Sequence, residues 1–219
     1  MFIGHWAPAM VAATRKDAPS LPTLFLAGQF VDWAFFGLVI VGVEKMRIEP
    51  GITKMNALDL YHMPYTHSLL GTFLFAALFA AIVYAFTRKK AAATIAGAVV
   101  VSHWFFDWLV HRPDLTLLGA PPKLGLGLWN HPALEMPLEL GLTFGALAIY
   151  AAWKKPDHKR LLAFAALLLA IQLFDWFSPP PPSDAITMLS FMAFLGYGVV
   201  TLAAWWVDRS SDRKPRWSK

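Results

Sequence analysis

"AAATIAGAVVVSHWFFDWLVH", residues 91–111, is an apolar run that ends in three ionisable side chains. A membrane-spanning helix needs roughly 20 apolar residues at about 1.5 Å each, so this run is long enough to span. Its polar members, His103, Asp107 and His111, are four residues apart and lie along one stripe of a helix. Imidazoles and carboxylates are costly in hydrocarbon unless they pair or bind something. The run therefore predicts a membrane helix that carries a functional stripe.

The composition favours the same class of protein. The 219 residues are 57% hydrophobic and 15% charged, whereas soluble domains average about 45–50% apolar and about 25% charged residues. The chain has no cysteine, which excludes disulfides, thiolate metal sites and a cysteine nucleophile. It also lacks the basic and aromatic repeats typical of nucleic-acid binding, and we predict none.

Six segments are long and apolar enough to span a membrane. They predict an all-α fold, a polytopic transmembrane bundle that forms one integral membrane domain over residues 1–219. A shorter apolar piece, residues 1–14, predicts an additional half-length helix. It lacks a basic segment at its start, so we do not interpret it as a signal peptide. The expected spans are 22–43, 66–87, 91–111, 133–153, 160–177 and 186–207.

The basic residues predict the orientation, since cytoplasmic loops are rich in Lys and Arg. One side of the expected bundle has five, at Lys45, Arg47, Lys54, Arg112 and Lys123. The other side therefore faces the cytoplasm and holds both termini, including a tail over 208–219. We then expect the long loops, 44–65 and 112–132, to face the periplasm or exterior. The cytoplasmic side has fourteen: Arg15, Lys16, Arg88, Lys89, Lys90, Lys154, Lys155, Lys159, Arg160, Arg209, Arg213, Lys214, Arg216 and Lys219.

The ionisable side chains inside the expected spans gather in their outer halves. Intramembrane groups of this kind are functional candidates by default. Nitrogen and carboxylate donors suit Zn²⁺ and, less selectively, Mn²⁺ or Fe²⁺. The spacings His103-x3-Asp107 and His131-x3-Glu135 place two donors one helical turn apart, where both can bind one ion. The candidate metal ligands are His5, Asp32, His67, His103, Asp107, His111, His131 and Glu135.

The order of these residues resembles that of a known superfamily. His…Asp…His…His-x3-Asp…His…His-x3-Glu is similar to the pattern of the zinc-dependent phospholipase C and single-strand nuclease superfamily. The fragments "YHMPYTHSLLGT" (61–72) and "SHWFFDWLVH" (102–111) also resemble the bacterial membrane-bound metal-dependent hydrolase family. That family shows a His-Arg-Gly-x-Thr-His-Ser block followed by a Ser-His-x3-Asp block. The resemblance covers roughly residues 1–140, and the last two expected helices carry no matching motif.

The resemblance implies two or three zinc ions. One would bind His67, His103 and Asp107, and a third would use His5 with Asp107 bridging. The second would bind His111, His131 and Glu135. The soluble relatives also use the backbone of an N-terminal Trp for the third ion, and this chain begins Met-Phe-Ile-Gly instead.

The resemblance further implies catalytic carboxylates. Asp107 is one of them. The first Asp in the family's pattern, a catalytic carboxylate in the soluble relatives, matches Asp32 or Asp59 here. Asp59 is nearer His67 in sequence, but Asp32 better fits the membrane relatives, and we favour it. The family's Arg-Gly is replaced here by residues 63–65, Met-Pro-Tyr. His62 and Arg112 are candidate substrate contacts, since a guanidinium binds phosphate well.

These features predict a zinc-dependent hydrolase that acts on a phosphoester at an outward-facing site. In a membrane the substrate would be a lipid or lipid-linked phosphate. We also expect the protein to be in contact with membrane lipids. An ion or metal transporter could use the same intramembrane cluster, although its paired discontinuous helices imply repeats, and the sequence shows none. A di-iron membrane oxygenase is a weaker alternative, because such enzymes typically need around eight clustered histidines and this chain has seven. A structural membrane protein without activity is the remaining alternative.

Overall fold

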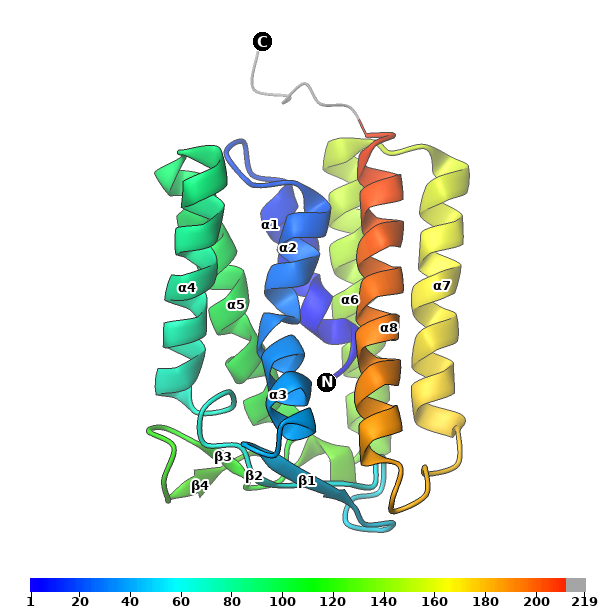
Figure 1. Ribbon diagram of the computed structural model, residues 1–219. Helices are drawn as coiled ribbons and strands as arrows, with labels where there is room; N and C mark the ends of the chain where they lie inside the picture. The colour runs from blue at the N-terminus through cyan, green and yellow to red at the C-terminus, as the bar shows by residue number, and fades with distance from the viewer. Residues whose placement is uncertain (212–219) are drawn as a thin grey trace.

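The computed structural model describes residues 1–211 and is mostly helical (Figure 1). Two short antiparallel hairpins are formed by β1 (Lys45–Ile48) with β2 (Leu58–His62), and by β3 (Leu115–Thr116) with β4 (Lys123–Leu124). Residues 212–219 of the expected cytoplasmic tail lie outside the described part. The helices are η1 (Ile3–Trp6), α1 (Ala7–Ala13), α2 (Leu21–Gly28), α3 (Phe30–Ile40), α4 (Leu69–Thr87), α5 (Lys90–Val110), η2 (Leu128–Asn130), α6 (Pro132–Lys154), α7 (His158–Phe177) and α8 (Ile186–Asp208).

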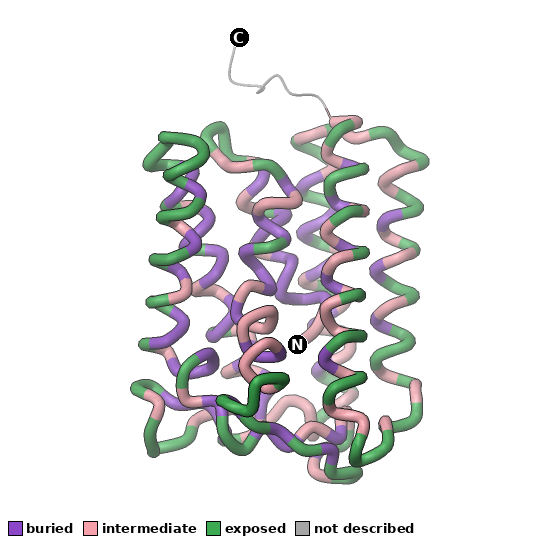
Figure 2. Tube along the Cα trace, viewed as in Figure 1, coloured by how far each residue is buried: buried purple, intermediate pink, exposed green. Residues whose placement is uncertain are grey.

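The long helices form a bundle whose outer surface is apolar. Helices α4, α5, α6, α7 and α8 are each long and apolar enough to cross a membrane, and α2 with α3 makes a sixth candidate span. These six agree with the six segments expected from the sequence. The side chains of Leu74, Phe174 and Leu202 are more than three-fifths exposed on this surface, and Figure 2 shows exposed positions along the outward faces. The fold is consistent with a membrane protein.

The first expected span is broken. Helices α2 and α3 meet at Gln29 with a bend of 50°. A Cβ atom on Gly28 would lie 2.8 Å from the backbone oxygen of His5, so glycine allows the N-terminal segment to pack against the break. The break also leaves the carbonyl group of Gly28 free to accept a hydrogen bond from a side chain, which is His103.

The N-terminal segment lies inside the bundle. The expected half-length helix is present as η1 followed by α1, and Ile3, Trp6 and Met10 are fully buried. The carboxylate of Glu139 accepts hydrogen bonds from the backbone N–H groups of Phe2 and Gly4, which satisfies donors that a helix start leaves unpaired. Met1 is therefore buried among the helices and does not lie at the end of the bundle that carries the basic loops (Figure 1).

The two hairpins lie together at one end of the bundle. Figure 1 shows them at the end opposite the C-terminus of α8. The connections that carry the basic residues 15–16, 88–90 and 154–160 lie at the other end. The charge asymmetry predicted from the sequence therefore coincides with the two ends of the structure.

Candidate metal centre

The stripe on α5 forms the middle of a buried cluster. His103 and Asp107 are almost fully buried on α5, the candidate span with the largest buried share. His5 comes from η1, Asp32 from α3, and His67 directly precedes the first turn of α4. Segments distant in sequence therefore bring their imidazoles and carboxylates to one place. The groups His5–His103–Asp107 and Asp32–His67–His103 could each hold a metal ion.

Two carboxylate oxygens, one from Asp32 and one from Asp107, lie close to the Nε2 atoms of His67 and His103. Asp32 Oδ1 lies 3.4 Å from Nε2 of His67 and 3.4 Å from Nε2 of His103. Asp107 Oδ2 lies 3.5 Å and 3.1 Å from the same two nitrogen atoms. A tetrahedral zinc ion with bonds of about 2.0–2.2 Å separates neighbouring ligand atoms by about 3.3–3.6 Å. Three of the four separations lie in this range, and the donor types suit a metal ion such as zinc.

The other oxygen of Asp107 faces a second group. Oδ1 lies 3.0 Å from His5 Nε2, 3.4 Å from His111 Nε2 and 3.7 Å from the α-amino nitrogen of Met1. The imidazoles of His5 and His103 are stacked, with ring centroids 3.9 Å apart. Asp107 therefore has the bridging position that the resemblance implied, between one group on Oδ2 and another on Oδ1.

Three of the histidines are held through their other ring nitrogen. His103 Nδ1 lies 2.8 Å from the carbonyl oxygen of Gly28, which the helix break leaves available. His111 Nδ1 lies 2.9 Å from Asp114 Oδ1. His67 Nδ1 lies 2.8 Å from the hydroxyl oxygen of Thr66. Acceptors of this kind on Nδ1 are typical of metal-binding histidines, because they fix the tautomer and the ring orientation.

The acceptor of His67 is itself oriented. Glu44, buried before β1, accepts a hydrogen bond of 2.6 Å from the Thr66 hydroxyl, and its other oxygen accepts from the backbone N–H groups of Tyr65 and Thr66. Since the hydroxyl proton points at Glu44, its oxygen is left to accept from His67 Nδ1–H. The Glu44–Thr66 pair thus fixes Nε2 of His67 as the free nitrogen.

This arrangement requires a cation between the rings and the carboxylates. A neutral imidazole that donates from Nδ1 presents the lone pair of Nε2, and here Nε2 of His67 and His103 faces carboxylate oxygens. Lone pairs facing each other at these distances are stable only if a proton or a metal ion lies between them. At His111, just beyond α5, burial lowers the pKa, but Asp107 and Asp114 outweigh it and raise the pKa to about 9. A metal ion at this nitrogen therefore displaces a proton.

The predicted set His111, His131 and Glu135 does not assemble. His131 caps α6 with φ −127° and ψ 66°, directly before Pro132, and is exposed. A residue before proline avoids the helical region, so the one-turn spacing to Glu135 does not hold. Glu135 is buried on α6 next to Glu139. Within residues 1–211, no ion pair or hydrogen bond joins His131 or Glu135 to His111, and the second ligand set is corrected accordingly.

The remaining candidates lie in the hairpin layer. Asp59 on β2 accepts hydrogen bonds from Arg47 and Arg112, and its carboxylate raises the pKa of Arg47. Asp32, which contacts two histidines, is therefore the early carboxylate of the cluster, and Asp59 is not. Arg112 also lies 3.6 Å from Asp114, whereas His62 is exposed on β2. The substrate roles of Arg112 and His62 stay predictions.

Sequence reasoning missed several partners of the cluster. Tyr197 on α8 donates a hydrogen bond of 3.2 Å to Asp32 Oδ2, and no spacing links it to the other ligands. Trp129 in η2 packs on the His111 ring, with centroids 4.2 Å apart. Asp114 follows His111 by three residues, and that spacing is a signal that could have found it.

No family model, curated protein or solved structure matches this chain. The likeness to the hydrolase family therefore rests on the sequence motifs. The metal site rests on the geometry of the cluster.

The partner of His67 provides a first test of that geometry. Replacing Thr66 by Val removes the hydroxyl but keeps the shape, leaving Nδ1 of His67 without its acceptor. We expect zinc affinity to fall about 10–100-fold, the usual cost of losing a partner of a metal-binding histidine. A competition titration with a fluorescent zinc chelator measures it. Thr143→Val is the matched control, since Thr143 is buried on α6 and its hydroxyl has no hydrogen-bond partner among residues 1–211. Equal losses in both variants would contradict this role of Thr66.

Proposed function

We propose that this chain is an integral protein of a bacterial inner membrane and a zinc-dependent hydrolase of a phosphoester. The observation that carries the proposal is the convergence of His67 and His103, each fixed at Nδ1, on two carboxylates through Nε2. Such a donor set suits zinc. The resemblance of the motifs to the membrane-bound hydrolases supports the reaction class, and the expected membrane environment supports a lipid or lipid-linked phosphate as substrate.

Different side chains of the cluster would have different roles in the reaction. Asp107, whose two oxygens face separate groups, would hold two ions close together, and His5 and His111 would complete the second group. A metal ion bound there would supply Lewis acidity towards a phosphoryl oxygen and an activated water. The side chain of Asp32 is 17% exposed, while those of the other ligands are 4% or less. The open side therefore lies at Asp32, which is placed to take a proton from the attacking water.

Tyr197 would act through Asp32 as a positioning residue. Its hydroxyl donates to Oδ2, which leaves Oδ1 directed at His67 and His103. The hydrogen bond from α8 would thus hold the Asp32 carboxylate in one orientation.

One structural feature favours a second function, an ion or metal transporter. The break between α2 and α3 lies beside the cluster, with Gly28 contacting His103 and Asp32 one turn further on. Discontinuous helices of this kind often line ion sites in transporters. Hydrolysis and transport differ in one assay, because only the hydrolase releases phosphate from a phosphoester in detergent, where there are no compartments.

The test is metal content together with phosphate release. Protein purified without added chelator is expected to contain at least one equivalent of zinc by elemental analysis. It should also hydrolyse lipid phosphoesters until a chelator is added, releasing phosphate from a monoester or a phosphomonoester from a diester. His131→Ala should retain the metal, because His131 is exposed and belongs to neither of the two groups that could hold a metal ion. Wild-type protein without a stoichiometric transition metal would refute the hydrolase, and metal without phosphate release would leave the transporter as the better proposal.

The orientation has its own test, made simple by the absence of native cysteine. Lys123→Cys places one thiol on β4 in the hairpin layer, and Lys155→Cys places one at the opposite end. In intact spheroplasts, an impermeant maleimide should label residue 123 at once and residue 155 only after permeabilisation. Labelling in the reverse order would put the metal centre on the cytoplasmic side.

A further inference from the structure

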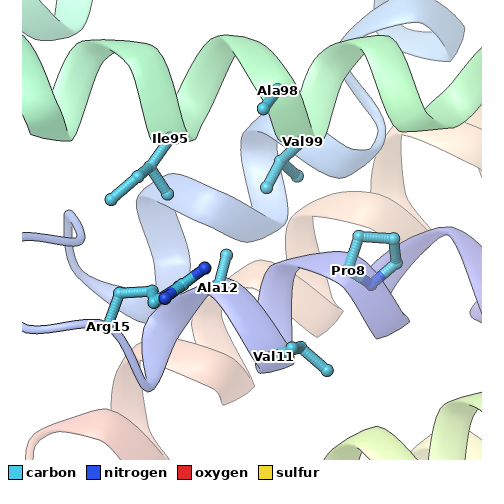
Figure 3. A pocket seen from close by; sticks show the side chains of 7 residues that line it. All are labelled: Pro8, Val11, Ala12, Arg15, Ile95, Ala98 and Val99. Carbon is cyan, nitrogen blue, oxygen red and sulfur yellow. The ribbon is translucent and has the colours of Figure 1, made fainter.

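A groove lies between α1 and α5, at the end of the bundle that carries the basic loops. It consists of two adjoining cavities of about 330 Å³ and 790 Å³, which share Val11, Arg15 and Ile95 in their walls. Cavities that bind small ligands measure about 300–1,000 Å³. Figure 3 shows Ile95 and Val99 projecting from α5 beside α1, with the Arg15 side chain at one end.

The groove exists because small residues line a short helix. Helix α1 has seven residues and contacts both α5 and α6. Pro8 and Ala12 on α1 and Ala98 on α5 leave space that larger side chains would fill. Ala98 and Val11 are exposed, so the groove opens onto the outer surface of the bundle. Its narrower part is therefore an apolar depression that is open at the side.

The wider part of the groove has a basic and aromatic rim. Arg15 and Lys16 lie on the connection after α1, and within residues 1–211 neither makes a salt bridge with a carboxylate. Asp17 is also in the lining, so the rim keeps an excess of one positive charge. Trp153, near the end of α6, completes it. Tryptophan and basic side chains are typical of the level where a membrane meets water.

We propose that this groove binds one anionic phospholipid of the adjacent leaflet. An acyl chain would occupy the apolar part between Ala12 and Val99, and the phosphate would lie against Arg15 and Lys16. The apolar walls offer no partners for a peptide backbone, whereas the charge of the rim complements a lipid phosphate. The proposal rests on the membrane placement proposed above and not on the metal chemistry.

The test measures which lipids the purified full chain retains. Protein in detergent is mixed with equimolar phosphatidylglycerol and phosphatidylcholine of matched acyl chains, and the retained lipids are counted by native mass spectrometry. We expect phosphatidylglycerol to be preferred. Arg15→Gln and Lys16→Gln should each weaken its retention about fivefold, the usual contribution of one basic side chain to an anionic lipid surface. Ala98→Phe, which fills the depression, should reduce retention of both lipids.

Matched controls change the same residue types elsewhere on the surface. Lys154→Gln with Lys155→Gln removes two charges from the same end, and Ala148→Phe adds a ring at an exposed position of α6. Both should retain lipid as the wild type does. Equal retention of the two lipids, or no effect of Ala98→Phe, would overturn the lipid site. Neither result would count against the metal centre, whose metal content is measured separately. Release of the chain from membranes by alkaline carbonate would overturn the membrane placement and the lipid site together.

Discussion

Replacing Asp107 by Asn is expected to remove metal binding and phosphate release together. The two oxygens of Asp107 face separate ligand groups, so one substitution weakens both. An amide is neutral, and its nitrogen does not bind zinc as a carboxylate oxygen does. Loss of an outer partner alone costs about 10–100-fold in metal affinity, so losing the bridging ligand should cost more than about 100-fold. Elemental analysis and phosphate release measure the two effects.

Because Asn has nearly the same shape as Asp, Asp107→Asn should not disturb the packing, and a second variant separates loss of metal from loss of stability. Asp208→Asn is the matched control, since Asp208 lies at the end of α8 and accepts hydrogen bonds from Tyr150 and Leu21. That variant should keep its zinc even if it loses some stability. If Asp107→Asn retained wild-type zinc, Asp107 would not be a ligand of the bound ion, and the proposed metal centre would fail.

The helices could be predicted because the bilayer imposes a simple rule on sequence. An apolar run of about 20 residues has few alternatives to a spanning helix. Along α5 the same rule made the side-chain geometry predictable, since one unbroken helix carries His103 and Asp107 at a fixed spacing. His67 and Asp32 also joined the cluster as expected. The geometry predicted best was that of His103 and Asp107, which lie on one unbroken helix.

The errors arose where a helix ends or breaks. The spacing of His131 and Glu135 suggested one helical face, but Pro132 starts the helix and leaves His131 outside it. The bend at Gln29 was not visible in the apolar pattern of residues 22–43, because no proline marks it. Local periodicity does not report such boundaries, which depend on how the N-terminal segment packs.

The partners of the metal ligands depend on tertiary contacts. Glu44 reaches Thr66 only because β1 and β2 fold back over the end of the bundle. Tyr197 reaches Asp32 across 165 positions of sequence. Neither contact has a signature in a single sequence, whereas the ligands themselves stand out because charged groups are rare in apolar helices.

The largest expected effect on folding belongs to Gly71→Ala at the start of α4. A Cβ atom there would lie 1.6 Å from the backbone oxygen of Tyr65 and 2.8 Å from Ser68 Oγ. The first of these is backbone, so the turn over residues 65–71 must move. Ser68 accepts a hydrogen bond from the N–H of Gly71 and caps the helix, so the cap is disturbed as well. Overpacking of this kind costs about 1–3 kcal/mol, and loss of a cap about 1 kcal/mol more.

The same turn holds His67, so Gly71→Ala should affect the metal centre as well as stability. The change has to move Tyr65 or α4, and either movement shifts His67 away from Asp32 and Asp107. We therefore expect a lower midpoint of thermal unfolding and substoichiometric zinc in the folded fraction that remains. Gly141→Ala on α6 is the control for the general effect of replacing a helical glycine. Among the described residues, nothing lies within 4 Å of the Cβ position at Gly141. Alanine in a helix interior favours folding by roughly 0.5–1 kcal/mol over glycine, so that variant should be as stable as the wild type or more so. A Gly71→Ala protein with normal zinc and unchanged stability would show that the turn before α4 does not position His67.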